Sequence, residues 1–133
     1  AGGAAAAEEQ LAWAEQILGA VGLVVRVGED KINAVTGLSG SGPAYVFLVA
    51  EALIDAGVLV GLTRDMASEL TIQTLLGSAE LLATGTPAAE LRAAVTSPGG
   101  TTAAGLHALE SASVRAAFTE AVIASATRAG ELG

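Results

Sequence analysis

Small polar residues and glycines gather at residues 97–102, which read Ser-Pro-Gly-Gly-Thr-Thr. Pro98 fixes one φ angle, and the glycines reach φ values that other residues avoid. The pattern predicts a turn that opens a helix and leaves the backbone N–H groups from Gly100 to Thr102 free. Free N–H groups at the positive end of a helix form a site for a carboxylate or a phosphate. A plain helix connection with a threonine cap is the alternative, and spacing alone does not separate the two.

A second glycine-rich segment, residues 37–42, reads Gly-Leu-Ser-Gly-Ser-Gly. It lacks the Gly-x-Gly-x-x-Gly spacing and the strand–turn–helix context of a dinucleotide-binding fingerprint. We expect a flexible turn between two helices here, with Ser41 as the N-cap of the second helix. The sequence therefore predicts no nicotinamide-cofactor fold within this chain.

Each of these segments is part of a longer motif. The first motif spans residues 91–110, and the second spans residues 34–47 and continues through 51–53, 55–58 and 61–62. In residues and in order, both motifs resemble those of pyrroline-5-carboxylate reductase, the enzyme of the last step of proline synthesis. The resemblance covers roughly residues 8 to 133. It implies hydride transfer from NADPH or NADH to the C=N bond of 1-pyrroline-5-carboxylate, which gives L-proline.

The resemblance also assigns roles to individual residues. Thr102 matches the catalytic threonine whose hydroxyl reaches the ring nitrogen, a role that needs no shifted pKa because a hydroxyl both donates and accepts. Ala94 stands where some relatives have asparagine, so that side-chain contact is missing. The substrate carboxylate is expected to bind to the turn. Three hydroxyl residues are expected near the nicotinamide or the substrate. A role as a helix cap or turn-forming residue explains Ser41 equally well. The turn residues are Ser97, Gly99, Gly100, Thr101 and Thr102, and the hydroxyl residues are Thr36, Ser39 and Ser41.

The same resemblance predicts two parts of the chain. Residues 1–28 correspond to the last helix and strand of an N-terminal dinucleotide-binding domain, and residues 29–133 to a helical dimerisation and substrate-binding domain. In the family, the helices of two subunits interlock and the substrate sites lie at their interface. NADPH or NADH is expected to bind tightly only to the complete enzyme, so the isolated chain is expected to be inactive. The alternative is a helical dimerisation module with no catalytic role.

The composition limits the possible partners. The net charge is −8, which argues against nucleic acid and anionic membranes. The chain has no cysteine and one histidine, so disulfides and multi-histidine metal sites are excluded. A cytoplasmic location is expected because residues 1–7 do not form a secretory leader. The longest uncharged runs, residues 33–50 and 93–109, contain turn signals that argue against a membrane span.

Apolar spacing predicts an all-α bundle with a short N-terminal helix–strand pair. Hydrophobic residues make up 52% of the chain and aromatic residues only 3%, so small residues must bring the helices close together. Residues 23–27 are β-like, and either they pair with a strand outside this chain or they form no strand. Helices are expected over residues 8–18, from 43 to about 59, over 64–83 with Thr63 as N-cap, over 87–94 and 101–110, and after Ser111 or Ser113. The helix over residues 64–83 is apolar on most sides, which favours an obligate homodimer.

Overall fold

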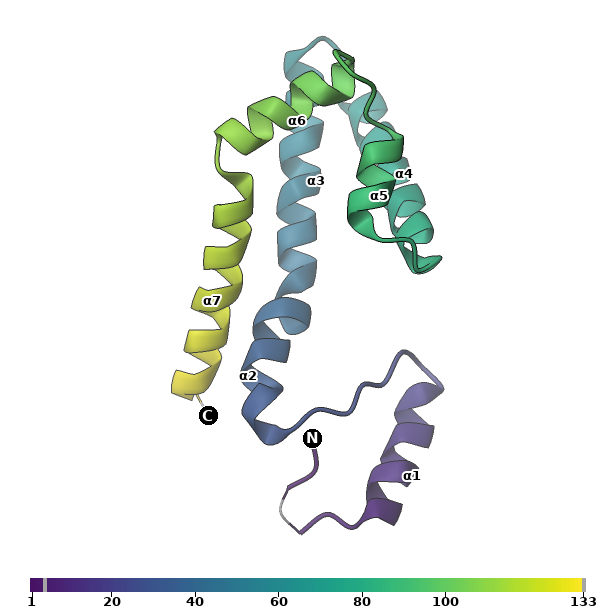
Figure 1. The fold of residues 1–133 in the computed structure, drawn as a ribbon, viewed down its shortest axis with the longest axis vertical. Helices are drawn as coiled ribbons and strands as arrows, with labels where there is room; N and C mark the ends of the chain where they lie inside the picture. The colour runs from purple at the N-terminus through teal and green to yellow at the C-terminus, as the bar shows by residue number, and fades with distance from the viewer. Residues whose placement is uncertain (4, 133) are drawn as a thin grey trace. The chain divides into compact units, whose positions relative to one another are not determined.

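All regular elements in the computed structural model, which describes residues 1–3 and 5–132, are helical (Figure 1). The chain forms two compact units, Ala1–Ser41 with Glu120–Gly133, and Gly42–Thr119. The elements are α1 (Glu8–Gly19), the 3-10 turn η1 (Glu29–Lys31), α2 (Ile32–Val35), the π-helical turn η2 (Thr36–Gly40), α3 (Gly42–Leu59), α4 (Arg64–Ala83), α5 (Ala88–Ala94), α6 (Thr101–Ser111) and α7 (Val114–Leu132). The expected all-α class is confirmed.

In the first unit, α1 begins directly after Ala7, whose backbone N–H donates to the Gln10 side chain at 2.9 Å. Arg26 connects the following segment to α1 through ion pairs with Glu8 (2.7 Å) and Glu15. Residues 23–27 form no strand within the described part of the chain, because a strand needs a hydrogen-bonded neighbour. In this chain the strand of the expected helix–strand pair is therefore not formed, which both alternatives for this run allow.

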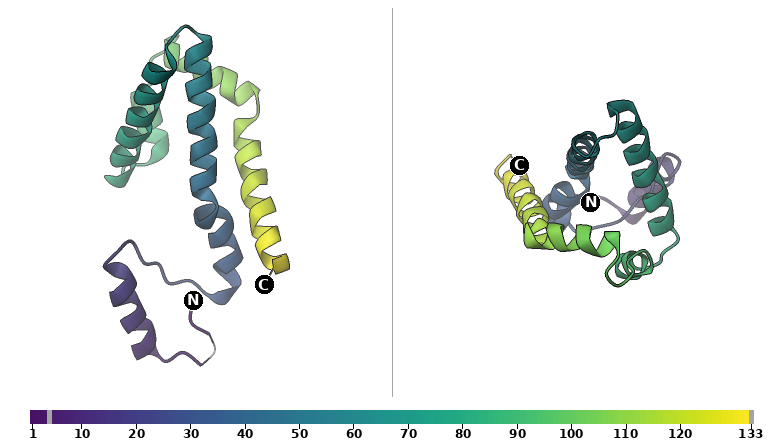
Figure 2. Two further views of the ribbon diagram at one scale, coloured as in Figure 1. Left: turned by 180° about the vertical axis from the view of Figure 1, so that it is seen from behind. Right: turned by 90° about the horizontal axis from the view of Figure 1, so that it is seen from above.

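In the second unit, α4 folds back beside α3, and α5 runs along α4 (Figures 1 and 2). A β-carbon added to Gly57 of α3 would lie only 2.9 Å from the Cβ of Ala67 on α4, so glycine sets the short spacing of the two helices. Thr63 caps α4 as predicted, because its hydroxyl accepts from the Met66 N–H at 3.3 Å. The expected bounds of α4 are confirmed.

The expectation of a flexible turn at residues 37–42 is wrong. The segment is a π-helical turn that runs directly into α3. Ser41 is not an N-cap: its backbone is helical (φ −88°, ψ −14°), whereas an N-cap residue is extended. The argument from turn signals against a membrane span therefore fails for this run. The helical stretch Glu29–Leu59 contains an 18-residue window with a mean hydropathy of 1.5, so by length and composition it could cross a membrane.

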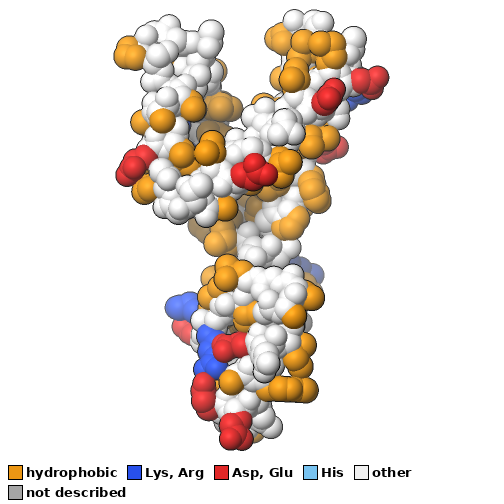
Figure 3. All heavy atoms as spheres, turned by 90° about the vertical axis from the view of Figure 1, so that its right-hand side faces the viewer, with side chains coloured by type: hydrophobic (Ala, Val, Ile, Leu, Met, Phe, Trp, Pro, Cys, Tyr) orange, Lys and Arg blue, Asp and Glu red, His pale blue; other side chains and the backbone are white. Residues whose placement is uncertain are grey.

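Few side chains of the described residues are buried. Ala67 (2% exposed) and Thr71 (8%) lie in the α3–α4 contact, and Gly37 is buried in η2. Large apolar side chains stay exposed on every long helix, and orange side chains cover much of the face in Figure 3. Examples are Trp13, Phe47, Leu48, Leu70, Ile72, Leu82, Phe118 and Ile123. The apolar faces of these helices are thus left largely uncovered within one chain.

Candidate functional site

The segment that links α5 to α6 contains a tight turn. The Gly100 N–H donates to the Ser97 carbonyl oxygen at 3.0 Å, with Pro98 and Gly99 between them. Gly99 has φ +69°, as the third residue of a type II turn requires. The expectation that the Gly100 N–H is free is therefore wrong, because the turn itself uses this donor.

The free donors lie one residue further along. Gly100 is the N-cap of α6 with extended backbone (φ −78°, ψ 173°), and no side chain caps the helix. The Ala104 N–H bonds the Gly100 carbonyl at 3.2 Å. Within the described part of the chain, the backbone N–H groups of Thr101, Thr102 and Ala103 have no acceptor. Three consecutive donors at the positive end of an 11-residue helix suit a carboxylate.

The shape of the turn also depends on Gly100. A β-carbon there would collide with the Ser97 Oγ and would lie 3.2 Å from the Ser97 carbonyl oxygen. Ser97, Gly99, Thr101 and Thr102 are exposed. The structure therefore brings the predicted substrate-binding residues together in one accessible turn, and it shows no threonine cap.

The three other hydroxyl residues lie in or next to η2. The Thr36 hydroxyl donates to the Ile32 carbonyl at 3.0 Å. Ser39 lines an open, mainly apolar cleft of about 640 Å³, together with Val35, Leu38 and residues between Leu18 and Val27. The Ser41 hydroxyl lies 2.8 Å from that of Ser125 on α7, and both residues are half-buried. Single π-helical turns occur frequently at functional sites.

Ser125 lies within the helix expected after Ser113, but no sequence pattern assigns it a function. Its partner Ser41 is 84 residues away in the chain, so no local pattern links the two. The small residues of α7 are a weak signal, because Ser125 and Ala126 lie where that helix meets η2 at Gly37.

Ionisable groups contribute little to these segments. The described residues contain no group of three or more His, Cys, Asp or Glu side chains that suits a metal ion. The Arg115 guanidinium, hydrogen-bonded to the Glu110 carboxylate at 2.7 and 2.9 Å, lowers the pKa of Glu110 and has its own pKa raised. This pair is exposed and joins α6 to the start of α7.

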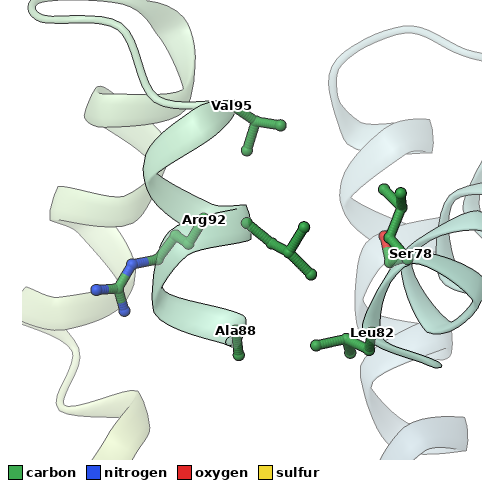
Figure 4. Close-up of a pocket in the computed structure, with 7 residues that line it drawn as sticks. Ser78, Leu82, Ala88, Arg92 and Val95 are labelled. Carbon is green, nitrogen blue, oxygen red and sulfur yellow. The ribbon is translucent and has the colours of Figure 1, made fainter. Parts of the chain in front are cut away.

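An apolar cavity of about 260 Å³ lies between α4 and α5 (Figure 4). Leu82, Ala88 and Val95 line it, and the Arg92 guanidinium points away from Leu82. Leu82 and Val95 are about half and two-thirds exposed. This surface suits apolar packing better than polar catalysis.

These features define a helical domain with uncovered apolar faces and a turn followed by three backbone N–H groups without acceptors. Residues 29–132 match the family model described as pyrroline-5-carboxylate reductase dimerisation. The chain belongs to this family of self-associating domains.

Several relatives carry the name pyrroline-5-carboxylate reductase. The protein from Arabidopsis thaliana is 50% identical over 98% of this chain and 48% of its own length, and that from Synechocystis is 54% identical over 94% and 47%. The solved Coxiella burnetii reductase has a TM-score of 0.91 at 45% identity, covering 98% of this chain and 49% of that one. The Plasmodium falciparum enzyme, solved with NADP bound, has a TM-score of 0.87 at 35% identity, covering 94% and 51%. The chain thus spans about half the length of the curated relatives it matches.

Proposed function

We propose that this chain is the dimerisation and substrate-binding part of a pyrroline-5-carboxylate reductase, which reduces the C=N bond of 1-pyrroline-5-carboxylate to L-proline. Residues 29–133 form that part, and residues 1–28 belong to the dinucleotide-binding domain. The family match supports this proposal, as does the row of free N–H groups at Thr101, Thr102 and Ala103. The overall charge of −8 repels an anion, so local donors must hold the substrate carboxylate.

In this proposal the carboxylate binds to the backbone N–H groups of Thr101, Thr102 and Ala103. The turn residues Ser97, Gly99 and Gly100 hold these donors in place and line the site. Thr102 is the catalytic residue, because its hydroxyl accepts from an iminium N–H or donates to a neutral amine. The reduction then needs mainly orientation of the ring, which fixed backbone donors supply.

NADPH or NADH supplies the hydride when it is bound to the complete enzyme. We assign Thr36, Ser39 and Ser41 to the nicotinamide end of the site. The π-helical turn supports this assignment, since it presents Ser39 at an open cleft. The isolated chain is expected to hold neither cofactor tightly.

The functional form is proposed to be a homodimer with interlocked helices. Large apolar side chains are exposed in both units, among them Trp13, Phe47 and Leu70. A monomer would leave these side chains in water, whereas a dimer interface can bury them. In such a dimer the apolar stretch Glu29–Leu59 packs against protein and not against lipid. The proposed location of the protein is the cytoplasm, with no membrane or nucleic-acid partner. Light scattering at micromolar concentration is expected to give a dimer or a larger oligomer, and a monodisperse monomer would contradict the proposal.

The second candidate is a helical module that only self-associates, and its uncovered apolar faces favour it. An assay of pyrroline-5-carboxylate turnover with NADPH separates the two. The complete reductase that contains this domain is expected to turn over, and the isolated chain, freed of host enzyme, is expected to show none. A dimeric complete protein without turnover would favour the inert module.

A further inference from the structure

Within the first unit, α7 packs closely against both η2 and the preceding helix α2. At Gly37, an added β-carbon would lie 2.7 Å from the Val122 carbonyl oxygen and 3.0 Å from the Ala126 nitrogen. At Gly130, an added β-carbon would lie 3.1 Å from the Asn33 side-chain nitrogen. The segment from α2 to η2 therefore has little freedom to shift along α7.

The Ser41–Ser125 pair is a polar side-chain contact between the glycine-rich segment and α7. The two hydroxyl oxygens are 2.8 Å apart, and both residues are half-buried. A serine hydroxyl has one proton and can take three staggered rotamers. A hydrogen bond to a fixed partner selects one of these rotamers. It also determines which donor or acceptor position of the hydroxyl stays available for a hydrogen bond to another molecule.

Other hydroxyls nearby bond within their own helices. Thr119, on the same helix as Ser125, donates to the Arg115 carbonyl at 3.0 Å, and Thr36 donates to the Ile32 carbonyl at 3.0 Å. The Ser125 hydroxyl is instead hydrogen-bonded to the hydroxyl of Ser41, which belongs to the glycine-rich segment. Its bond therefore acts on the placement of Ser41 and not on its own helix.

We propose that Ser125 is a positioning residue for the reductase reaction, which fixes the Ser41 hydroxyl in the rotamer that meets the nicotinamide or the substrate. The proposal rests on the proposed function. It assigns Ser125 no contact with either ligand: the residue acts only through Ser41.

A double-mutant cycle in the complete reductase tests this role. The variants are Ser125→Ala, Ser41→Ala and both together, with Thr119→Ala as a control that removes a hydroxyl from the same helix. Loss of one hydrogen bond predicts a kcat/KM about threefold to tenfold lower for Ser125→Ala. Because Ser125 acts through Ser41, the double variant is expected to be no slower than Ser41→Ala alone. Ser125→Thr keeps the hydroxyl and is expected to restore the rate.

Thermal unfolding of each variant separates positioning from packing. A Ser125→Ala enzyme with a lower Tm and an unchanged kcat/KM would overturn the proposal, as would losses that add in the double variant. If the alanine variant does not fold, Ser125→Cys preserves the size, weakens the hydrogen bond and replaces it in the cycle. Absence of turnover in the unmodified enzyme would refute the proposed function and this inference together.

Discussion

Gly37 of η2 faces the Val122 carbonyl oxygen of α7 so closely that a β-carbon on Gly37 would lie 2.7 Å from that oxygen. The Ala126 nitrogen would be 3.0 Å away, so both obstacles are backbone atoms that no side-chain rotation can remove. The close approach of α7, and not a left-handed backbone, therefore requires glycine at this position.

The substitution Gly37→Ala is expected to lower the free energy of unfolding by about 1–3 kcal/mol, because overpacking forces the two backbones apart. Urea unfolding of the isolated domain, followed by circular dichroism at a fixed protein concentration, measures the change. The concentration must be fixed because the unfolding of a dimer depends on it.

Gly40 in the same π-helical turn provides the control. Its added β-carbon would meet only the Thr36 side chain, with the methyl group at 3.7 Å, which is an ordinary contact. Gly40→Ala is expected to leave stability unchanged or to raise it by up to about 1 kcal/mol, because alanine reduces the freedom of the unfolded chain. Equal losses in both variants would show that the contact with α7 is not the reason for glycine at position 37.

The sequence predicts the long helices well because their signals are local. Thr63 caps α4, Gly85 follows its end with φ +87°, and α3 ends at Leu59 shortly before Gly61 with φ +108°. Each of these signals acts within a few residues of the helix end that it determines.

The sequence fails where distant residues decide the structure. Gly37 and Gly40 suggest a flexible turn, but contact with α7 stabilises a π-helical turn instead. Ser41 suggests a helix cap, but its hydroxyl is used by Ser125, 84 residues away. The sequence predicts the turn before α6, which the structure contains, but it misplaces the row of free donors by one residue, because the bond from Gly100 to Ser97 uses the first of them.

The α3–α4 contact offers a second packing test. The substitution Gly57→Ala brings a methyl group to 2.9 Å from the Ala67 Cβ and is expected to cost about 1–3 kcal/mol of unfolding free energy. Adding Ala67→Gly removes the opposing methyl group, so the double variant is expected to be less destabilised than the sum of the single changes. The same urea experiment on the unmodified protein, the two single variants and the double variant measures the whole cycle. Changes in unfolding free energy that simply add would contradict a direct contact between positions 57 and 67.

The Glu110–Arg115 pair makes a small part of the stability depend on pH. The hydrogen bond from Arg115 lowers the pKa of Glu110 in the folded state, so the pair stabilises the fold above the ordinary pKa of glutamate. This contribution is lost as the pH falls through the lowered pKa. NMR titration of the carboxylate is expected to show a higher pKa in Arg115→Met than in the unmodified protein. The neighbouring Arg92 acts only through its charge, so Arg92→Met is expected to raise the pKa less, and equal shifts would contradict the hydrogen bond as the main cause.

The two threonines at the start of α6 are proposed to contribute to the reaction in different ways. Both supply a free backbone N–H group, and alanine keeps that group in either position. Only the hydroxyl of Thr102 is proposed to face the reacting nitrogen, so Thr102→Ala is expected to lower kcat/KM of the complete reductase by about tenfold or more. Thr101→Ala is expected to change kcat/KM by less than about threefold, because it removes no proposed contact.

Binding of a substrate analogue separates catalysis from carboxylate binding. Because the carboxylate is proposed to rest mainly on backbone N–H groups, the Kd for proline is expected to be similar in both variants and in the unmodified reductase. Exposed helix-terminal donors contribute only about 0.3–1 kcal/mol per charge, so the isolated domain is expected to bind proline with a Kd of about a millimolar or weaker. A larger loss of kcat/KM in Thr101→Ala than in Thr102→Ala would move the catalytic hydroxyl one residue earlier, while leaving the row of backbone donors in place.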